Sequence, residues 1–186
     1  TLVHDEIERG YLLHVPAALD ASRPMPLVLA LHGGGGTGAR MVRLTGGGFN
    51  TLADRDGFIV AYPDGLEKHW NDGRAGVSWR AHRDGVDDVG FLAALIARLA
   101  GEWPVDARRV YVTGASNGGM MAIRLGCELA EKIAAIAPVI GAIHSSSPSS
   151  ARGSDCVHAS SVPSGDTSGS YWLSVTPGVS NVSPAR

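Results

Sequence analysis

One segment of the sequence combines a candidate nucleophile with the local pattern that could activate it. Ser116 lies in a Gly-x-Ser-x-Gly pattern over residues 114–118, between an apolar segment ending at Thr113 and a helix-forming segment from Met120. This context predicts a nucleophile elbow, in which glycines permit a sharp turn because they carry no Cβ. The Asn117 N–H would then face the negative charge that develops on an attacked carbonyl. The alternative is an ordinary glycine-rich turn.

A second signal is the string of four glycines that starts at Gly33, directly after an apolar strand segment and His32. Backbone N–H groups in such a loop can complete an oxyanion hole, and Gly34, or else Gly33, would join Asn117 as donor. A phosphate-binding loop is the rival interpretation, but no Gly-Lys-Ser/Thr sequence follows. We interpret His32 as a residue that pins the loop by a hydrogen bond, because it lies at a strand end and precedes the serine.

The catalytic base and acid have no equally clear pattern. A serine hydroxyl needs a base within hydrogen-bond reach, and a third group must orient that base. If the catalytic residues follow one another along the chain in the order Ser, Asp, His, the candidates are Asp155 as acid and His158 as base. These two residues are only three positions apart in a Ser-rich segment, whereas an acid and a base usually lie on two separate loops at strand ends. His144 is the alternative base. It follows the last clear strand but has no evident downstream acid with a fixed position.

Other polar and aromatic residues cluster in the loop over 64–80, where loops on a rigid sheet often contact substrate. Trp70 and Trp79 are candidates to line an acyl or aryl pocket, and buried loop residues are the alternative interpretation. Asp87 and Asp88 start a predicted helix, so we interpret them as helix caps rather than catalytic groups.

The elements that position these residues alternate between strands and helices. Apolar segments predict strands near 10–16, 27–31, 57–63, 109–113 and 133–140, and helices near 49–55, 87–100 and from 120. The order strand, strand, helix, strand, helix, strand, helix, strand predicts an α/β fold with a mainly parallel, doubly wound sheet.

Composition fits one domain with a sizeable core, since 44% of the 186 residues are hydrophobic. The net charge of −2 and the lack of Lys/Arg clusters argue against a nucleic-acid partner. No apolar run approaches the roughly 20 residues of a membrane span, and no signal peptide is recognisable. The chain starts at Thr1, which is compatible with a removed leader or upstream domain. Cys127 and Cys156 permit one disulfide, but we expect free thiols.

From about Tyr11 to Ala142 the sequence resembles the polyhydroxybutyrate depolymerase and feruloyl-esterase-like branch of the α/β-hydrolases. The matching motifs are Leu31-His32-Gly33-Gly34-Gly35, Tyr62-Pro63-Asp64-Gly65, Trp70-Asn71, Val86-Asp87-Asp88-Val89-Gly90-Phe91, Gly114-Ala115-Ser116-Asn117-Gly118-Gly119-Met120 and Ala137-Pro138-Val139. The resemblance implies secreted enzymes that hydrolyse feruloyl, aryl or hydroxyalkanoate esters. It assigns Ser116 as nucleophile and places Asn117 and the loop after His32 at the oxyanion hole. An acyl-enzyme mechanism of this kind needs neither metal nor cofactor.

The C-terminal region departs from this resemblance, because the family continues with strands that carry the acid and the histidine. Here the sequence is rich in Ser, Pro and Gly, so we expect a hydrolase core over 1–144 and a linker-like tail over 145–186. Only 171–175 has a strand-like pattern. Unless segment 171–175 fills the gap, segment 133–140 would be an exposed sheet edge that promotes self-association. The alternative function is therefore a truncated, catalytically impaired protein that acts as a binding or structural module.

Overall fold

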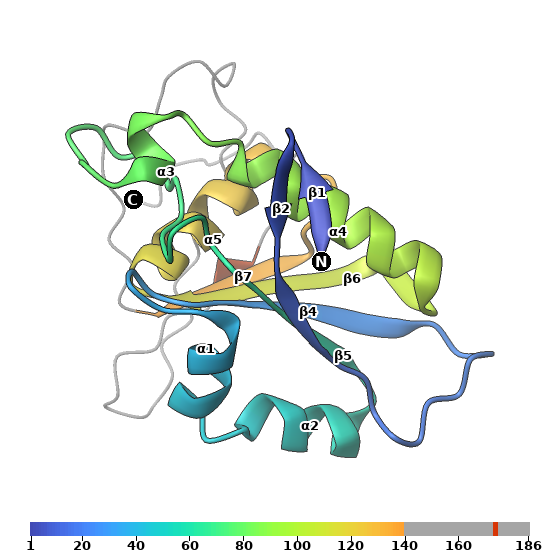
Figure 1. Ribbon diagram of the computed structural model, residues 1–186. Coiled ribbons are helices and arrows are strands. Elements are labelled where there is room, and N and C mark those ends of the chain that lie inside the picture. The colour runs from blue at the N-terminus through green and yellow to red at the C-terminus, as the bar shows by residue number, and fades with distance from the viewer. Residues whose placement is uncertain (140–172, 175–186) are drawn as a thin grey trace, which may run out of the picture.

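A mainly parallel six-stranded sheet forms the centre of the molecule in the computed structural model, which describes residues 1–139 and 173–174 (Figure 1). The sheet order is β3-β5-β4-β6-β7-β8, with β3 and β8 antiparallel to their neighbours at the two edges. Its strands are β3 (Tyr11–His14), β4 (Met25–Leu31), β5 (Ile59–Pro63), β6 (Val105–Ala115), β7 (Ala135–Val139) and β8 (Leu173–Ser174). The predicted α/β class and the four central parallel strands are confirmed.

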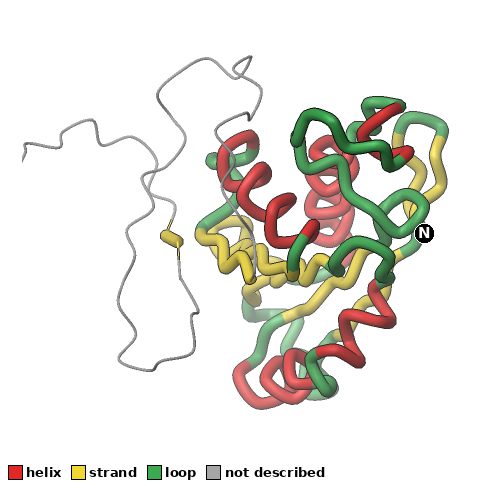
Figure 2. The backbone as a smooth tube through the Cα atoms, turned by 90° about the vertical axis from the view of Figure 1, so that its left-hand side faces the viewer, coloured by secondary structure: helices red, strands yellow, loops and turns green. Residues whose placement is uncertain are grey.

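Helices cover both faces of the sheet. The helices are α1 (Gly38–Leu44), α2 (Gly48–Asp56), α3 (Arg80–Arg83), α4 (Asp88–Glu102) and α5 (Asn117–Glu128). Figure 1 shows α1 and α2 on one face and α4 and α5 on the other, and the turned view in Figure 2 shows the same three layers. The sequence pattern missed α1, α3 and the separate hairpin of β1 (Leu2–His4) and β2 (Ile7–Arg9), all of which are short.

The side chains of β4 alternate between two hydrophobic cores. Leu27, Leu29 and Leu31 are fully buried in the larger core, which also contains residues of α4 and α5. Ala30 faces the smaller core beneath α1 and α2, together with Met41. A strand buried on both faces requires the uninterrupted apolar run that the sequence shows.

The edge of the sheet at β7 is paired over part of its length. Leu173 and Ser174 pair with Ile136 and Ala135, so these two residues of the predicted segment form a strand. The strand-like pattern is thus confirmed at residues 173–174, which pair with the edge of β7. At the far end of β7, Val139 is 47% exposed. The predicted domain boundary at 144 lies outside the described residues and stays a prediction.

In the part of the chain that the structure describes, no helix has the length and apolar character that crossing a membrane requires.

Candidate functional site

Ser116 occupies a strained turn between the end of β6 and the start of α5. Its backbone angles are φ 51° and ψ −116°, a combination that non-glycine residues rarely adopt, and its side chain is exposed. A Cβ on Gly114 would overlap the Gly118 carbonyl, and one on Gly118 would lie 2.5 Å from the carbonyl oxygens of Leu31 and His32. The glycines of the motif are thus sterically required, and the predicted elbow geometry is present.

The elbow presents its first helical N–H groups on the side of the exposed serine. Asn117 is the first residue of α5, and N–H groups in the first turn have no acceptor within the helix. The Ser116 N–H donates to the Val139 carbonyl at 2.9 Å, which fixes the turn against the end of β7. This arrangement leaves the Asn117 N–H available for an anion at the helix N-terminus.

The glycine loop after β4 lies directly against the elbow. A Cβ built on Gly33 would be 3.6 Å from the Ser116 Cβ. The N–H groups of Gly35 and Gly36 are already used, because they donate to the carbonyls of Lys68 and Gly33 at 2.8 and 2.9 Å. Gly34 is exposed. The candidate oxyanion donors in this loop are therefore the N–H groups of Gly34 and Gly33.

His32 pins this loop, as predicted. Its buried ring accepts a hydrogen bond from the Gly65 N–H at Nε2 (2.9 Å), so Nδ1 must carry the proton that it shares with the Gly33 carbonyl (2.8 Å). Burial lowers the pKa of His32 below its usual value of 6.5 and keeps the ring neutral. Because both ring nitrogens are engaged, His32 is not available as a base for Ser116.

Trp70 does not line a substrate pocket, which corrects one of the two tryptophan predictions. Its side chain is fully buried in the larger core, and its indole N–H donates to the His32 carbonyl at 2.9 Å. Trp70 therefore anchors the loop after β5 to the core. The alternative interpretation, that it is a buried loop residue, is correct.

Trp79, in contrast, lies beside the glycine loop and is partly exposed. Its ring stacks on His69 with centroids 4.1 Å apart. A Cβ built on Gly34 would lie 3.2 Å from His69 and 3.5 Å from Trp79. The stacked pair thus forms a wall over Gly34. Sequence reasoning missed His69, although its place next to Trp70 in an aromatic and polar loop was a usable signal.

Sequence reasoning also missed Asp72, whose side chain is completely buried behind the elbow. Its carboxylate accepts hydrogen bonds from Arg74 (2.7 Å at the shortest), His82 (2.9 Å) and the side-chain amide of Asn117 (2.6 Å). Burial alone would raise the pKa of Asp72, but these hydrogen bonds outweigh it and hold the pKa below 3.8. The Asn117 side chain also bonds both backbone groups of Trp70, so the loop after β5 is fastened to the elbow.

The two acids before α4 have different roles. Asp87 caps the helix, because its side chain accepts the Gly90 N–H at 2.8 Å, as predicted. The cap interpretation is wrong for Asp88, which is fully buried, pairs with Arg9 at 2.6 Å and accepts the Asn71 N–H at 2.6 Å. Asp88 therefore stabilises the interior beside the same loop.

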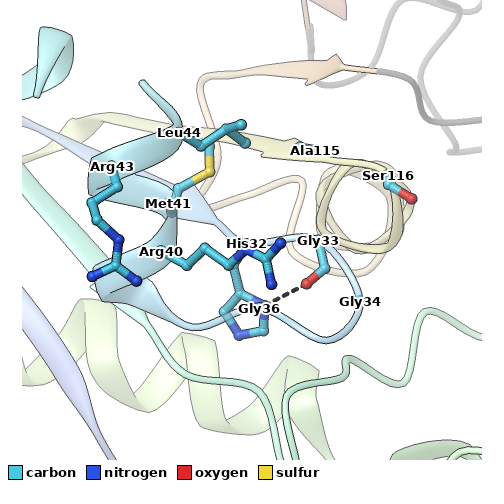
Figure 3. A pocket seen from close by; sticks show the side chains of 10 residues that line it. All are labelled: His32, Gly33, Gly34, Gly36, Arg40, Met41, Arg43, Leu44, Ala115 and Ser116. Atoms are coloured by element: carbon cyan, nitrogen blue, oxygen red, sulfur yellow. Dashed lines mark hydrogen bonds between the residues drawn. The ribbon is translucent and has the colours of Figure 1, made fainter. Parts of the chain in front are cut away.

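A cavity of about 500 Å³ opens beside Ser116, between the glycine loop and α1 (Figure 3). The lining residues come from the β4–α1 loop, from α1 and from the elbow: His32, Gly33, Gly34, Gly36, Arg40, Met41, Arg43, Leu44, Ala115 and Ser116. An exposed serine at the rim of such a cavity has room for one portion of a small ester.

The remaining site predictions fall outside the described residues. Asp155, His158 and His144 all lie there, as does Cys156, while Cys127 is half-buried on α5. Within residues 1–139 and 173–174, no side chain forms a hydrogen bond with the Ser116 hydroxyl. The assignment of the base and acid therefore stays a prediction.

Comparison with known proteins places this geometry in a family. Residues 9–166 match the family described as "Esterase PHB depolymerase". The chain is 38% identical over 138 residues to a putative esterase, NocK, of Nocardia uniformis subsp. tsuyamanensis, with 74% of this chain and 39% of NocK covered. It is 33% identical to the bifunctional acetylxylan esterase/xylanase XynS20E of Neocallimastix patriciarum, with 71% of this chain and 18% of that protein covered.

A solved structure, the acetyl xylan esterase from Aspergillus awamori, superimposes with a TM-score of 0.54 at 26% identity, covering 69% of this chain and 45% of that enzyme. The chain thus spans less than half the length of these relatives. The similarity and the mainly parallel sheet confirm the α/β-hydrolase fold. Because the family match extends over most of the chain, the protein belongs to the esterase PHB depolymerase family.

Proposed function

We propose that the protein is a carboxylic ester hydrolase that acts through an acyl-enzyme on Ser116. The observation that carries this proposal is the strained, exposed Ser116 between β6 and α5, with the Asn117 and Gly34 N–H groups nearby and a cavity at its side. Membership of the family and the similarity to named esterases support the same reaction class.

The reaction follows from this arrangement. The Ser116 oxygen attacks the ester carbonyl carbon while a base removes its proton, and the tetrahedral oxyanion accepts hydrogen bonds from the N–H groups of Asn117 and Gly34. Collapse of this intermediate expels the alcohol, which takes the proton from the base. Water then hydrolyses the acyl-enzyme by the reverse sequence. We assign the base to His158, with His144 as alternative, and the acid to Asp155. This route uses no metal or cofactor.

The substrate that we propose is a feruloyl or other aryl ester, or a hydroxyalkanoate polyester. We also propose that the enzyme is secreted. The curated relatives include proteins named feruloyl esterase and acetylxylan esterase. The stacked rings of His69 and Trp79 over Gly34 favour an aryl group, because offset aromatic rings attract one another beyond their buried area.

A second candidate is a binding or structural module that no longer catalyses. The observation that favours it is that, among residues 1–139 and 173–174, no side chain forms a hydrogen bond with the Ser116 hydroxyl. An oxyanion hole and binding alone retain about 10³–10⁴-fold acceleration over water when a triad member is absent, so even an impaired enzyme has a Ser116-dependent rate.

Labelling with a fluorophosphonate, peptide mapping and an assay with a short p-nitrophenyl ester separate the two candidates. We expect an adduct on Ser116 and a rate that is lost in Ser116→Ala but kept in the matched control Ser22→Ala, an exposed serine in the loop before β4. Turnover that persists in Ser116→Ala contradicts the proposed mechanism. Loss of both the adduct and the Ser116-dependent rate favours the non-catalytic module.

We also propose that a second copy of the chain pairs with the edge at β7. Among the described residues, β8 pairs with Ala135 and Ile136 but not with the rest of β7, and Val139 is 47% exposed at the end of the strand. An open strand edge readily accepts another strand, and a charged side chain on it discourages this pairing. Light scattering should therefore detect oligomers that Val139→Lys reduces. A monomer at every concentration tested would exclude this contact.

A further inference from the structure

Two arginines line the Ser116 cavity without a carboxylate partner. Most arginines in the described part of the chain form ion pairs, for example Arg9 with Asp88 and Arg124 with Glu128. Arg40 and Arg43 form none with any described residue, and the lining includes no acidic side chain. The lining of the cavity beside the candidate nucleophile therefore carries two guanidinium groups and no carboxylate.

The side chains of the two arginines point in different directions (Figure 3). Arg40 extends from α1 toward the Gly33–Gly34 loop, whereas Arg43 points away from Ser116. Met41 and Leu44 lie on the same wall and offer apolar contacts. The cavity thus brings together the hydroxyl of Ser116, the side chain of Arg40 and the apolar side chains of Met41 and Leu44.

The position of Arg40 is fixed by the start of α1. The Gly38 N–H donates to the Asp64 side chain at 2.7 Å, and the Arg40 N–H donates to the Thr37 hydroxyl at 3.2 Å. Met41 is buried in the smaller core, which holds the helix against the sheet. Arg40 therefore projects from a fixed backbone, and only its side chain must be ordered when an anion binds.

We propose that this cavity binds an ester that also carries a carboxylate, and that Arg40 is the side chain that recognises it. This inference rests on the proposed function, because it takes the Ser116 cavity as the substrate site. A guanidinium presents parallel N–H donors that match a carboxylate in a bidentate pair. Met41 and Leu44 line the same cavity and offer apolar contacts to the rest of the ester.

The test uses the Ser116→Ala chain, so that probes bind without turnover. Monomethyl glutarate carries its carboxylate on the acyl side, and 4-acetoxybutyrate carries it on the alcohol side. Dimethyl glutarate and methyl 4-acetoxybutyrate are their neutral counterparts. Dissociation constants come from NMR titrations that follow the amide signals of Gly33 and Gly34.

At least one anionic probe should bind about three- to fivefold more tightly than its neutral counterpart, which is typical of a partly exposed ion pair, and added salt should reduce the preference. Arg40→Ala in the same background should abolish the preference, and Arg40→Lys should retain part of it. The preference should survive in Arg23→Ala, the matched control. Arg23 is exposed and forms no ion pair with another described residue, and it precedes the opposite end of β4.

Equal affinity for anionic and neutral probes, a preference that Arg40→Ala leaves unchanged, or no binding at Gly33 and Gly34 would overturn this inference. The esterase assay of the wild type tests the proposed function separately. Hydrolysis of neutral esters without an anionic preference contradicts the role of Arg40 alone. Arg40-dependent binding of an anionic probe, in a chain with no Ser116-dependent turnover, contradicts only the catalytic proposal.

Discussion

The carboxylate of Asp72 lies 2.6 Å from the side-chain amide of Asn117, the residue that follows Ser116. Asp72 belongs to the loop after β5 and Asn117 to the start of α5, so this contact joins two segments that are 45 residues apart. A buried, hydrogen-bonded carboxylate restricts the groups around it, and here it restricts the residue whose backbone N–H is a candidate oxyanion donor.

The same carboxylate also supports the other side of the site. Arg74 and His82 both donate to Asp72 and also lie against the ring of Trp79. The Arg74 Cζ atom is 5.5 Å from the centroid of that ring, and the His82 ring centroid is 5.8 Å from it. Trp79 in turn stacks on His69. Asp72 therefore connects the elbow with the aromatic wall over the glycine loop.

Asp72→Asn should slow fluorophosphonate labelling of Ser116 and shift the NMR signal of the Asn117 amide. It should also lower the free energy of unfolding by about 2–4 kcal/mol, because Arg74 loses its partner but keeps some access to water. Asp88→Asn is the matched control, a second buried carboxylate paired with an arginine beside the same loop. It should destabilise the fold to a similar extent without a specific effect on labelling. Equal effects of both variants, after correction for unfolding, would contradict a positioning role for Asp72.

Acidification should destabilise the protein through His32. Burial is the main cause that lowers the pKa of His32 in the folded state. At pH values below 6.5, the unfolded chain therefore binds a proton on this ring that the folded chain does not. Stability from the neutral ring is therefore complete above pH 6.5 and declines as the pH falls toward the folded-state pKa, by at most about 1.4 kcal/mol per pH unit. Urea unfolding at several pH values should show a smaller decline for His32→Gln, which can still accept from Gly65. Parallel profiles would refute this linkage.

Gly118→Ala should damage the elbow. The added Cβ would meet the carbonyl oxygens of Leu31 and His32 at 2.5 Å, and these backbone atoms belong to the central strand and the glycine loop. We expect a loss of about 1–3 kcal/mol in unfolding free energy, typical of overpacking, together with loss of Ser116 labelling. Gly101→Ala is the control, because nothing lies near its Cβ position in α4, and it should stabilise by about 0.5–1 kcal/mol. A Gly118→Ala chain with normal stability and labelling would contradict the steric argument.

The two tryptophans of the loop after β5 should respond differently to truncation. Trp70→Ala removes a fully buried ring and an N–H donor, so it should cost about 3–5 kcal/mol in stability. Trp79→Ala should change stability much less but should raise KM for aryl esters relative to acetyl esters, because the ring stacked on His69 faces the glycine loop. Thermal unfolding and ester kinetics on both variants check this contrast. A larger stability loss in Trp79→Ala than in Trp70→Ala would reverse the assignment.

Local sequence pattern alone determined the strands of the central sheet, the elbow and the pinned glycine loop. The uninterrupted apolar run of β4 predicted a strand buried on both faces, and the glycines at 114 and 118 predicted a turn that tolerates no Cβ. These features were predictable because each one depends on residues adjacent in the chain, where backbone geometry and side-chain size act directly.

Only the tertiary structure decided which polar and aromatic residues of the loop after β5 serve the site. Trp70 and Trp79 lie in the same polar and aromatic loop, and the sequence does not distinguish them. In the structure, Trp70 is buried in the core, whereas Trp79 stacks on His69 beside the glycine loop. Asp72 and Asp88 became identifiable as buried partners through Asn117 and Arg9, which are 45 and 79 residues away. Such contacts depend on how the loops and the N-terminal hairpin pack around the sheet, and packing between distant segments leaves no periodic pattern in the sequence.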